Sequence, residues 1–497
     1  MKKIVSSRVM RESDEYTCLN ITSSNELMYR AGKGIYESVA NWGKTAVVCG
    51  AGNNAGDGFV VAKLIHENGG EATIFLLSEK FSESGKFYFD MCAAMGVKTE
   101  KCTESTDFSG FDTVLDCIFG TGFHGEVRGL AAEIIDKINA SGARIVSADI
   151  NSGLSADSGM SAKCVRSDFT VSVGSYKYGH FLGMAKDVMR EKKNVDIGIE
   201  IRGEYAILAE KEDFLPLIKP RKNNSNKGTY GYVGIMGGCR EYSGAVKLAG
   251  MGASALRSGC GVAKLIVPES IAAAVAPFIL ESTLCPLADE AGHIIFNKAA
   301  LDGALSGLAA LSLGMGWGRS VENAKILEYI LSEKALPLVI DADGLNTLAG
   351  MDKSLLKSTG CRVVLTPHPK EFERISGVPV AELLQDPVPH AKAFAREYGV
   401  ILLLKGASTV ITDGGTTYIC DRGSAGMATA GSGDVLSGVL AGLLGYMECT
   451  PATVALGAYI AGAAGELAAA EYTEVAMTAG DTAGKLPAVW RGLLEKS

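Results

Sequence analysis

The chain has 497 residues and a formal net charge of −8, with 47% hydrophobic and 21% charged residues. This composition excludes an intrinsically disordered chain. The acidic balance excludes the basic face that general nucleic-acid binding requires, so local N–H groups and a few Lys or Arg side chains must hold any anionic ligand. Because one ordinary core does not extend over this length, we expect two domains.

The cysteines and histidines follow no metal-binding pattern. No C-x-x-C pair occurs among the 12 cysteines, and the 6 histidines lack ligand spacing. We therefore expect reduced, buried thiols in a cytoplasmic protein, without a zinc site or a disulfide framework. No apolar stretch typical of a signal peptide follows the first ten residues. Residues 452–470 are apolar but contain Glu466 and several glycines, which predicts a buried helix and no membrane span.

The first part of the chain alternates between predicted helices and strands. Residues 23–26 form a capping box for a helix that reaches about residue 42. Apolar runs predict strands at 45–49, 72–77, 113–118, 144–150 and 169–173, and helices at 59–68 and 130–141. Near-continuous apolar strands that alternate with helices predict a Rossmann-like α/β domain, with a doubly wound parallel sheet covered on both faces.

A second α/β series begins after the polar, proline-containing segment 219–227, which we interpret as a linker. A long helical tail, rich in Ala and Gly, follows Asp434. We expect an N-terminal domain at 1–215 and a C-terminal domain at 216–497, with the boundary between about 205 and 228. The second series predicts strands at 231–236, 262–267, 309–313, 337–340, 362–365 and 400–404.

A glycine-rich turn at 50–58, with the sequence GAGNNAGDG, follows the first predicted strand of the sheet. Glycine allows close approach of a phosphate, and the start of the next helix offers unpaired N–H groups. The turn is neither the dinucleotide fingerprint nor a P-loop. Two further polar segments, at 116–129 and 149–159, also follow predicted strands. Together they suit a ligand with phosphate and hydroxyl groups, or a weakly hydrated cation.

These segments resemble the NAD(P)H-hydrate epimerase domain, with its patterns G-x-G-N-N-x-G-D-G, D-x-x-F-G-T-G and D-x-x-S-G. The resemblance covers residues 1 to about 205, and 175–180 resembles the later Lys-Gly stretch of that family. Asn151 stands where the family usually has proline. The resemblance implies an enzyme that interconverts the two epimers of NADH or NADPH hydrated at C6 of the nicotinamide ring (NADHX and NADPHX).

The resemblance also implies roles for residues of this domain. Asp149 would touch the substrate and is the candidate for proton transfer, while a simple helix-capping role is the structural alternative. A potassium ion would be coordinated by Asn54, Asp116 and Ser152, which offer oxygen ligands. The phosphate and sugar parts of the substrate would be held by Asn53, Asn54, Ala55, Gly56 and Asp57, and by Gly120, Thr121, Gly122, Phe123, His124, Gly125 and Glu126.

The C-terminal series carries its chemistry in TAGSGD, at 429–434. Gly431, Ser432 and Gly433 can present successive N–H groups to a phosphoryl group at the start of a helix. Asp434 is then placed to take a proton from an attacking hydroxyl. Further polar segments follow predicted strands at 236–245, 313–318, 341–346, 366–372 and 405–415.

This arrangement resembles the ribokinase-like superfamily and, within it, the NAD(P)H-hydrate dehydratase branch, over about 228–490. His368-Pro-Lys-Glu371 resembles the segment that organises Mg²⁺ and phosphates there. The resemblance implies that a nucleotide phosphorylates the C6 hydroxyl and that phosphate then leaves. The hydrate would contact Ala245, Gly316, His368 and Asp434. The nucleotide, favoured as ADP with ATP possible, would contact Lys405, Gly406, Ala407, Ser408, Thr409 and Gly433.

Three hypotheses follow, of which a bifunctional repair enzyme is favoured. A ribokinase-like kinase for another small molecule, with an accessory nucleotide-binding domain, is the second. The third makes the N-terminal domain a non-catalytic nucleotide sensor, against which its intact polar set argues. In each case we expect small-molecule partners, no nucleic acid, no membrane and a homo-oligomer.

Overall fold

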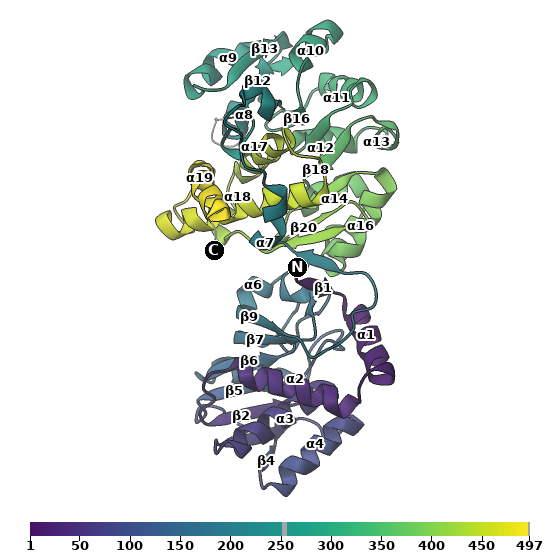
Figure 1. Ribbon diagram of the computed structural model, residues 1–497, viewed down its shortest axis with the longest axis vertical. Coiled ribbons are helices and arrows are strands. Elements are labelled where there is room, and N and C mark those ends of the chain that lie inside the picture. The colour runs from purple at the N-terminus through teal and green to yellow at the C-terminus, as the bar shows by residue number, and fades with distance from the viewer. Residues whose placement is uncertain (251–255, 496–497) are drawn as a thin grey trace. The chain divides into compact units, whose positions relative to one another are not determined.

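The computed structural model describes residues 1–250 and 256–495, which fall into two compact units (Figure 1). One unit spans residues 2–206, and the other spans residues 207–497 together with Met1. The units divide at 206/207, within the range of about 205–228 in which the domain boundary is expected and before the chosen position 215/216. The reason is β10 (Ala206–Leu208), which pairs with β21 (Thr417–Cys420) and so draws the chain into the second unit.

The first unit is built on a parallel sheet with the strand order β4-β3-β2-β5-β6-β7-β9. The predicted Rossmann-like architecture is therefore confirmed. A shorter parallel pair joins β1 (Lys3–Val5) to β8 (Tyr176–Lys177). The strands of the main sheet are β2 (Thr45–Cys49), β3 (Ala72–Leu76), β4 (Lys98–Lys101), β5 (Thr113–Cys117), β6 (Arg144–Ala148), β7 (Ser167–Val173) and β9 (Met189–Val195).

Helices cover both faces of this sheet because alternate side chains of each strand point to opposite faces. Val47 and Cys49 of β2 pack with α2 (Ser24–Ser38), α3 (Asn53–Glu67) and α4 (Glu83–Ala94). Ala46 and Val48 pack in a second core with α5 (Leu130–Ala140). Helix α3 begins at Asn53, earlier than the predicted start at 59, so the second half of the glycine-rich turn is helical.

Helix α1 (Ser7–Asn20) was not predicted. Its buried face consists of Val9, Met10, Ser13 and Thr17, so half of that face is polar and the apolar spacing is incomplete. Hydrogen bonds hold these polar residues: the Arg202 N–H donates to Ser13 Oγ (2.9 Å) and the Glu200 N–H donates to Thr17 Oγ1 (3.2 Å). A short helix, α6 (Ala185–Val188), precedes β9.

The second unit has the strand order β13-β12-β11-β16-β17-β18-β19-β20-β21-β10. Its strands are parallel from β13 to β19, and β20 is antiparallel to both neighbours. A separate antiparallel ribbon joins β14 (Asp289–Glu290) to β15 (His293–Ile294). The other strands are β11 (Tyr232–Met236), β12 (Val262–Pro268), β13 (Thr283–Leu287), β16 (Ala310–Leu313), β17 (Pro337–Ile340), β18 (Arg362–Leu365), β19 (Ile401–Leu404) and β20 (Thr409–Thr412).

Helices also lie on both sides of this sheet (Figure 1). One side carries α8 (Ser243–Gly250), α17 (Ser432–Leu444), α18 (Pro451–Tyr472) and α19 (Ala479–Leu494), and the other carries α11 (Val321–Glu333), α13 (Leu355–Ser358) and α16 (Pro387–Tyr398). The remaining helices are α7 (Lys211–Phe214), α9 (Glu269–Val275), α10 (Lys298–Leu305), α12 (Asp343–Ala349), α14 (Pro369–Ser376) and α15 (Val380–Gln385).

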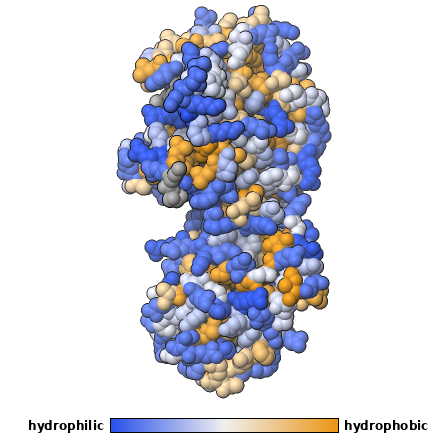
Figure 2. Space-filling model, viewed as in Figure 1, coloured by the Kyte–Doolittle hydropathy of each residue, from blue (hydrophilic) through white to orange (hydrophobic). Residues whose placement is uncertain are grey.

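Helix α18 is long and apolar enough to cross a membrane by length and composition, but 72% of its apolar window is buried inside the protein. Glycines let it pack closely, since a Cβ at Gly457 would lie 2.6 Å from Leu440 of α17. The predicted buried helix is confirmed. Hydrophilic side chains cover much of the face shown in Figure 2, with smaller hydrophobic patches between them.

Each sheet contains a point where the strand order reverses direction. In the first unit β3 lies on one side of β2 and β5 on the other, and in the second unit β12 and β16 flank β11 in the same way. Loops that leave such neighbouring strands diverge, and they open a crevice at the carboxyl ends of the strands. The glycine-rich turn at 50–52 and the loops after β11 and β16 begin at these points.

Candidate active sites

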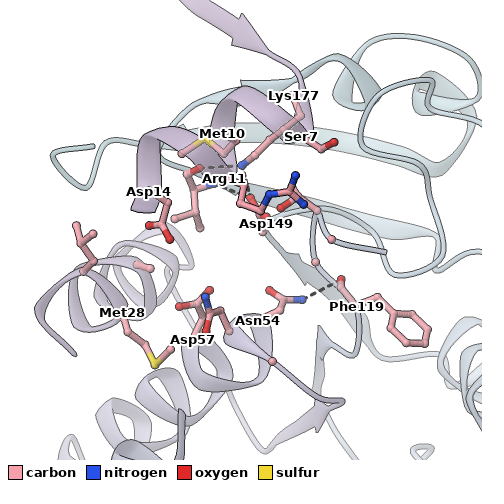
Figure 3. A pocket seen from close by; sticks show the side chains of 18 of the residues that line it. Ser7, Met10, Arg11, Asp14, Met28, Asn54, Asp57, Phe119, Asp149 and Lys177 are labelled. Carbon is pink, nitrogen blue, oxygen red and sulfur yellow. Dashed lines mark hydrogen bonds and ion pairs between the residues drawn. The ribbon is translucent and has the colours of Figure 1, made fainter. Parts of the chain in front are cut away.

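The first unit contains a cavity of about 610 Å³ at the carboxyl ends of β2, β5 and β6 (Figure 3). The cavity is lined by many of the residues that were predicted to bind the substrate: Asn53, Asn54, Asp57, Gly120, Thr121, Gly122, Phe123, His124 and Asp149. Four others do not line it. Ala55 is buried in the core, Gly56 packs against Met28, and Gly125 and Glu126 lie outside the lining.

The glycine turn is required by close backbone packing. A Cβ at Gly50 would lie 2.0 Å from the carbonyl oxygen of Ile118, so only glycine lets the ends of β2 and β5 approach in this way. Gly52 has a φ of 86° and is the N-cap of α3, where no side chain caps the helix. The first N–H groups of α3 are therefore available to a ligand in the cavity.

Asn54, Asp116 and Ser152 form a cluster of oxygen atoms beside the cavity. The Ser152 N–H (2.9 Å) and the Ser152 and Ser147 hydroxyls donate to the fully buried Asp116 carboxylate, and the Phe119 N–H donates to Ser152 Oγ (2.8 Å). Asn54 donates to the Phe119 carbonyl (3.0 Å), yet among the residues that the structure describes its buried Oδ1 has no hydrogen-bond partner. An orphaned amide oxygen next to a carboxylate suits a weakly hydrated cation.

Asp149 lies at the end of β6 and forms an ion pair with Lys177. The Val173 N–H also donates to Asp149 Oδ1 (3.2 Å). Asp149 has a φ of 62°, a left-handed conformation that is uncommon outside glycine and clusters at functional sites. Lys177 is 1% exposed and Asp149 is 13% exposed, so the ammonium is sealed behind a carboxylate that reaches the cavity.

His180 holds the backbone of Asp149. Its Nε2 lies 2.7 Å from the Asp149 carbonyl oxygen, and its Nδ1 accepts from the Lys177 N–H (3.0 Å). Burial, followed by the nearby Lys177 charge, lowers the pKa of His180 to about 4. The ring is therefore neutral, with the proton assigned to Nε2 by its partners. Sequence analysis did not separate His180 from the other histidines, because its partner is a backbone carbonyl.

Asn151, where the family usually has proline, is fully buried in this turn. Its amide nitrogen donates to the carbonyls of Val165 and Val188, each at 2.9 Å, and its Oδ1 accepts from Thr170 Oγ1 (2.6 Å). Hydrogen bonds thus fix the turn in place of a proline ring, and the neighbouring Asp149 and Ser152 keep their positions.

The second site centres on Asp341, at the end of β17. Its Oδ1 accepts from Lys405 Nζ (2.9 Å) and its Oδ2 from Ser437 Oγ (2.7 Å). Glu371 Oε2 lies 3.7 Å from the same ammonium. The pKa of Asp341 is lowered by Lys405 and by its hydrogen bonds, although burial opposes this. Segment 341–346 was predicted to contribute to this pocket, but neither Asp341 nor Ser437 was assigned a role, since the sequence does not show which side chains of β17 and α17 meet.

The start of α17 lies beside this pair. Gly431 is its N-cap with a φ of 95°, and Ser432 Oγ is buried without a partner among the residues described. A Cβ at Gly433 would lie 3.4 Å from Asp341 Oδ2 and 3.5 Å from Lys405 Nζ, so the helix start and the ion pair share one space. Burial and the nearby Asp341 charge raise the pKa of Asp434 to about 7. Asp434 is therefore able to accept a proton near neutral pH.

Other predicted residues of this site divide into groups. Ala245 and Gly316 meet, since a Cβ at Gly316 would lie 2.8 Å from that of Ala245. His368 caps α14 by accepting from the Lys370 (3.1 Å) and Glu371 (3.3 Å) N–H groups. Gly406 and Ala407 are exposed near Lys405, whereas Ser408 is buried and donates to Asp421 (2.6 Å). Thr409 begins β20.

Fold and sites together define a class of protein: a two-unit α/β enzyme in which each unit has its own polar cluster at the carboxyl ends of the parallel strands of its sheet. Comparisons with known proteins agree with this class. A family model described as NAD(P)H-hydrate dehydratase matches residues 233–488. A second family model, described as YjeF-related protein N-terminus, matches residues 24–179.

Curated relatives extend over both units. The bifunctional NAD(P)H-hydrate repair enzyme of Moorella thermoacetica is 35% identical, over 97% of this chain and 95% of the relative. The enzyme of the same name from Escherichia coli is 31% identical, over 92% and 87%. The chain therefore belongs to the family of bifunctional NAD(P)H-hydrate repair enzymes.

Solved structures support the fold of the second unit. The ADP/ATP-dependent NAD(P)H-hydrate dehydratase of Bacillus subtilis, co-crystallised with ATP and Mg²⁺, aligns with a TM-score of 0.50 at 27% identity, over 58% of this chain and 99% of that one. A ribokinase-like superfamily protein of Enterococcus faecalis aligns with a TM-score of 0.51 at 23% identity, over 58% and 96%. The predicted ribokinase-like fold is confirmed.

Proposed function

We propose that this chain repairs hydrated NADH and NADPH in two steps. The N-terminal unit interconverts the R and S hydrates at C6, and the C-terminal unit returns the S hydrate to NAD(P)H in a reaction that uses a nucleotide. The observation that supports this most directly is that two separate polar clusters lie in one chain that is similar to named repair enzymes over 97% of its length.

In the N-terminal unit, the start of α3 and the loop at 120–124 would hold the phosphate and sugar parts of the substrate. Asp149 would exchange protons with the hydroxylated ring. Lys177 holds the Asp149 carboxylate in place through their ion pair. The neutral His180 ring fixes the backbone of Asp149, and so it keeps the carboxylate directed into the cavity.

In the C-terminal unit, Asp434 would take the proton of the C6 hydroxyl as its oxygen attacks the terminal phosphoryl group of the nucleotide. The N–H groups at the start of α17 and the Lys405 ammonium would stabilise the transferring phosphoryl group. Phosphate then leaves with the electrons of the C6–O bond while the ring-nitrogen lone pair forms a C=N bond. Loss of a C5 proton restores the ring double bond. With ADP as donor, the products are AMP and phosphate.

Potassium fits the first site. The unpartnered Asn54 Oδ1, the Asp116 carboxylate and Ser152 Oγ would hold it, and its charge would compensate the buried carboxylate. At the second site, no group of three or more His, Cys, Asp and Glu residues within 1–250 and 256–495 suits a metal ion. Glu371 and the nucleotide phosphates would therefore hold Mg²⁺ together, as is usual for this ion.

Incubation of each purified hydrate epimer with ADP or ATP, with Mg²⁺ and K⁺ present, tests this function. We expect the near-ultraviolet absorbance of reduced nicotinamide to return from both epimers, together with release of phosphate. Failure with both epimers would overturn the proposal. Recovery from the S epimer alone would remove the epimerase half, and a stable phosphorylated product would favour the small-molecule kinase.

A further inference from the structure

Helix α1 forms a wall of the first cavity, although it lies outside the segment 24–179 that the N-terminal family model matches. Its residues at the cavity recur at helical spacing: Ser7, Met10, Arg11, Asp14 and Cys18. Hydrogen bonds fix the helix in place, since the Ser7 N–H donates to Asp157 Oδ1 (2.7 Å) and the Arg202 N–H donates to Ser13 Oγ. The cavity face of α1 is therefore a built part of the site.

Asp14 is the half-buried acidic residue on this face. Its carboxyl group points into the cavity, opposite the side chains that α3 contributes (Figure 3). Within the described part of the chain, no hydrogen bond or ion pair reaches this carboxyl group. Burial, then the charges of Glu15 and Asp149, raise its pKa, while Lys177 lowers it. Asp14 therefore holds a proton more firmly than an ordinary aspartate does.

The cavity contains more carboxyl groups than positive partners. Asp14, Asp57 and Asp149 all line it, against two positive side chains, Lys177, which is paired with Asp149, and Arg11. Asp57 is 9% exposed, also lacks a hydrogen bond or ion pair among the described residues, and has a pKa raised well above its usual value, mainly by burial. The site thus combines one carboxylate paired with an ammonium, Asp149, with two carboxyl groups, Asp14 and Asp57, whose pKa values are raised above the ordinary value.

The proposed reaction needs both kinds of group. To change the configuration at C6 by ring opening, the hydroxyl proton must leave as the C6–N1 bond breaks, and N1 must gain a proton as it receives the electrons of that bond. A single ionised carboxylate supplies only the first of these transfers. A protonated group on another wall of the cavity supplies the second.

We propose that Asp14 is the second catalytic residue of the epimerase site, an inference that rests on the function proposed above. The Asp149 carboxylate takes the hydroxyl proton, the C6–N1 bond breaks to give an aldehyde, and N1 takes the proton of Asp14. After rotation about the C5–C6 bond, N1 attacks the other face of the aldehyde and returns its proton to Asp14. The new C6 oxygen then takes the proton held by Asp149, so both carboxyl groups regain their starting states.

Asp57 is the competing candidate. It lies on the first turn of α3, at the glycine turn where the phosphates would bind, and it is almost fully buried. Asp14 comes from a separate wall and is more open to the cavity. These positions favour Asp14 as the group that exchanges a proton with the ring. The charged and titratable groups around Asp14 are Arg11, Glu15 and Cys18 on α1, Asp57 on α3, and Asp149 and Lys177.

The test is Asp14→Asn in the full-length chain. Chromatography monitors the epimerisation of a single purified hydrate, and the rate measured without enzyme is subtracted. We expect kcat to fall about 100-fold or more, with KM within a few-fold of the unsubstituted chain. The unsubstituted chain should also lose activity at high pH as Asp14 loses its proton, and Asp14→Asn should lack this decline. Asp14→Glu should recover part of the activity.

The matched control is Glu15→Gln, the same change on the exposed side of α1, which should keep full epimerase activity. Dehydration of the S hydrate by the second unit should not change in any variant, and an unchanged Tm of the first unit reports that each variant is folded. An epimerase kcat of Asp14→Asn within three-fold of that of the unsubstituted chain would overturn the inference. Loss of epimerase activity in Asp57→Asn while Asp14→Asn stays active would overturn it as well. If the unsubstituted chain does not epimerise at all, the proposed function fails instead.

Discussion

At the scale of the residue, charge partners and hydrogen bonds decide which of the buried carboxyl groups can carry a proton at neutral pH. Asp341 and Asp434 lie close together, yet their pKa values shift in opposite directions. Asp341 accepts hydrogen bonds from Lys405 and Ser437, which stabilise its charge, whereas Asp434 is desolvated beside that charge. Neighbouring carboxyl groups with separated pKa values are typical of acid–base sites.

A pH profile of the dehydratase step checks the role of Asp434. Because its pKa is about 7, we expect the rate to rise as pH increases through 7 and then to level off. Asp434→Asn should lower the rate by about 100-fold or more and remove this dependence. A rate that is flat with pH between about 5 and 9 in the unsubstituted chain would contradict Asp434 as the base.

The same shift affects stability. The folded pKa of about 7 exceeds the ordinary value of 3.8, so the folded state binds this proton more tightly than the unfolded state does. The stabilisation is present at low pH and is lost as pH rises through 7. Asp434→Asn should therefore raise the Tm of the second unit at about pH 8 and do so less at about pH 5.

The orphaned oxygen of Asn54 leads to a test of ion binding. If K⁺ occupies this position, KCl should raise the Tm of the first unit relative to NaCl at equal ionic strength, because an ion bound only to the folded state stabilises it. Asn54→Leu should abolish the difference, while Asn20→Leu, at the exposed end of α1, should retain it. Equal Tm values of the unsubstituted chain in both salts would remove potassium from this site.

At the scale of the element, each site is a helix start positioned by a strand end. Helices α3 and α17 both begin without a side-chain cap, at glycines with a positive φ. Their first N–H groups are left for a ligand, and a capping Ser or Asp would occupy them. The partners differ: an amide and buried carboxylate beside α3, and an ion pair beside α17.

Gly50→Ala tests how much the first site depends on the close approach between the ends of β2 and β5. The added methyl group would lie 2.0 Å from the Ile118 carbonyl oxygen, and backbone cannot move aside as a flexible side chain can. We expect the first unit to lose about 2–3 kcal/mol in its free energy of unfolding, together with epimerase activity. Gly110→Ala is the control, because no atom of the described residues lies within 4 Å of its added methyl group.

At the scale of the whole molecule, the two sites draw on different parts of the chain. The first cavity is lined by residues from 7 to 199, and the cluster around Asp341 comes from the second unit. The proposed product of the first site is the substrate of the second. Both activities therefore act on one compound, although neither cluster needs a side chain from the other unit.

This independence predicts complementation between variants. Asp149→Asn should convert only the S hydrate to NAD(P)H, and Asp434→Asn should only epimerise. After the rate of epimerisation without enzyme is subtracted, neither variant by itself should convert the R hydrate to NAD(P)H. An equal mixture of the two variants should convert the R hydrate to NAD(P)H, since the S hydrate can diffuse from one protein molecule to another. A mixture that remains inactive, with each single activity intact, would contradict independent sites.

The sequence by itself determined the architecture and the strand-end motifs. Strands such as β2, β17 and β18 match their predicted ranges because continuous apolar runs between glycines have few alternative structures. The glycine turn, the epimerase segments and TAGSGD were identified for the same reason: their residues are contiguous. Local order along the chain is what a single sequence records best.

Only the tertiary structure decided which distant residues meet. Helix α1 was missed because Ser13 and Thr17 occupy half of its buried face, and their hydrogen-bond partners lie near residue 200. Asp14 thus reaches the first cavity from a segment without a recognisable motif. Likewise, Ser437 meets Asp341 across 96 residues. Such contacts depend on how sheets and helices pack, so no local spacing in the sequence encodes them.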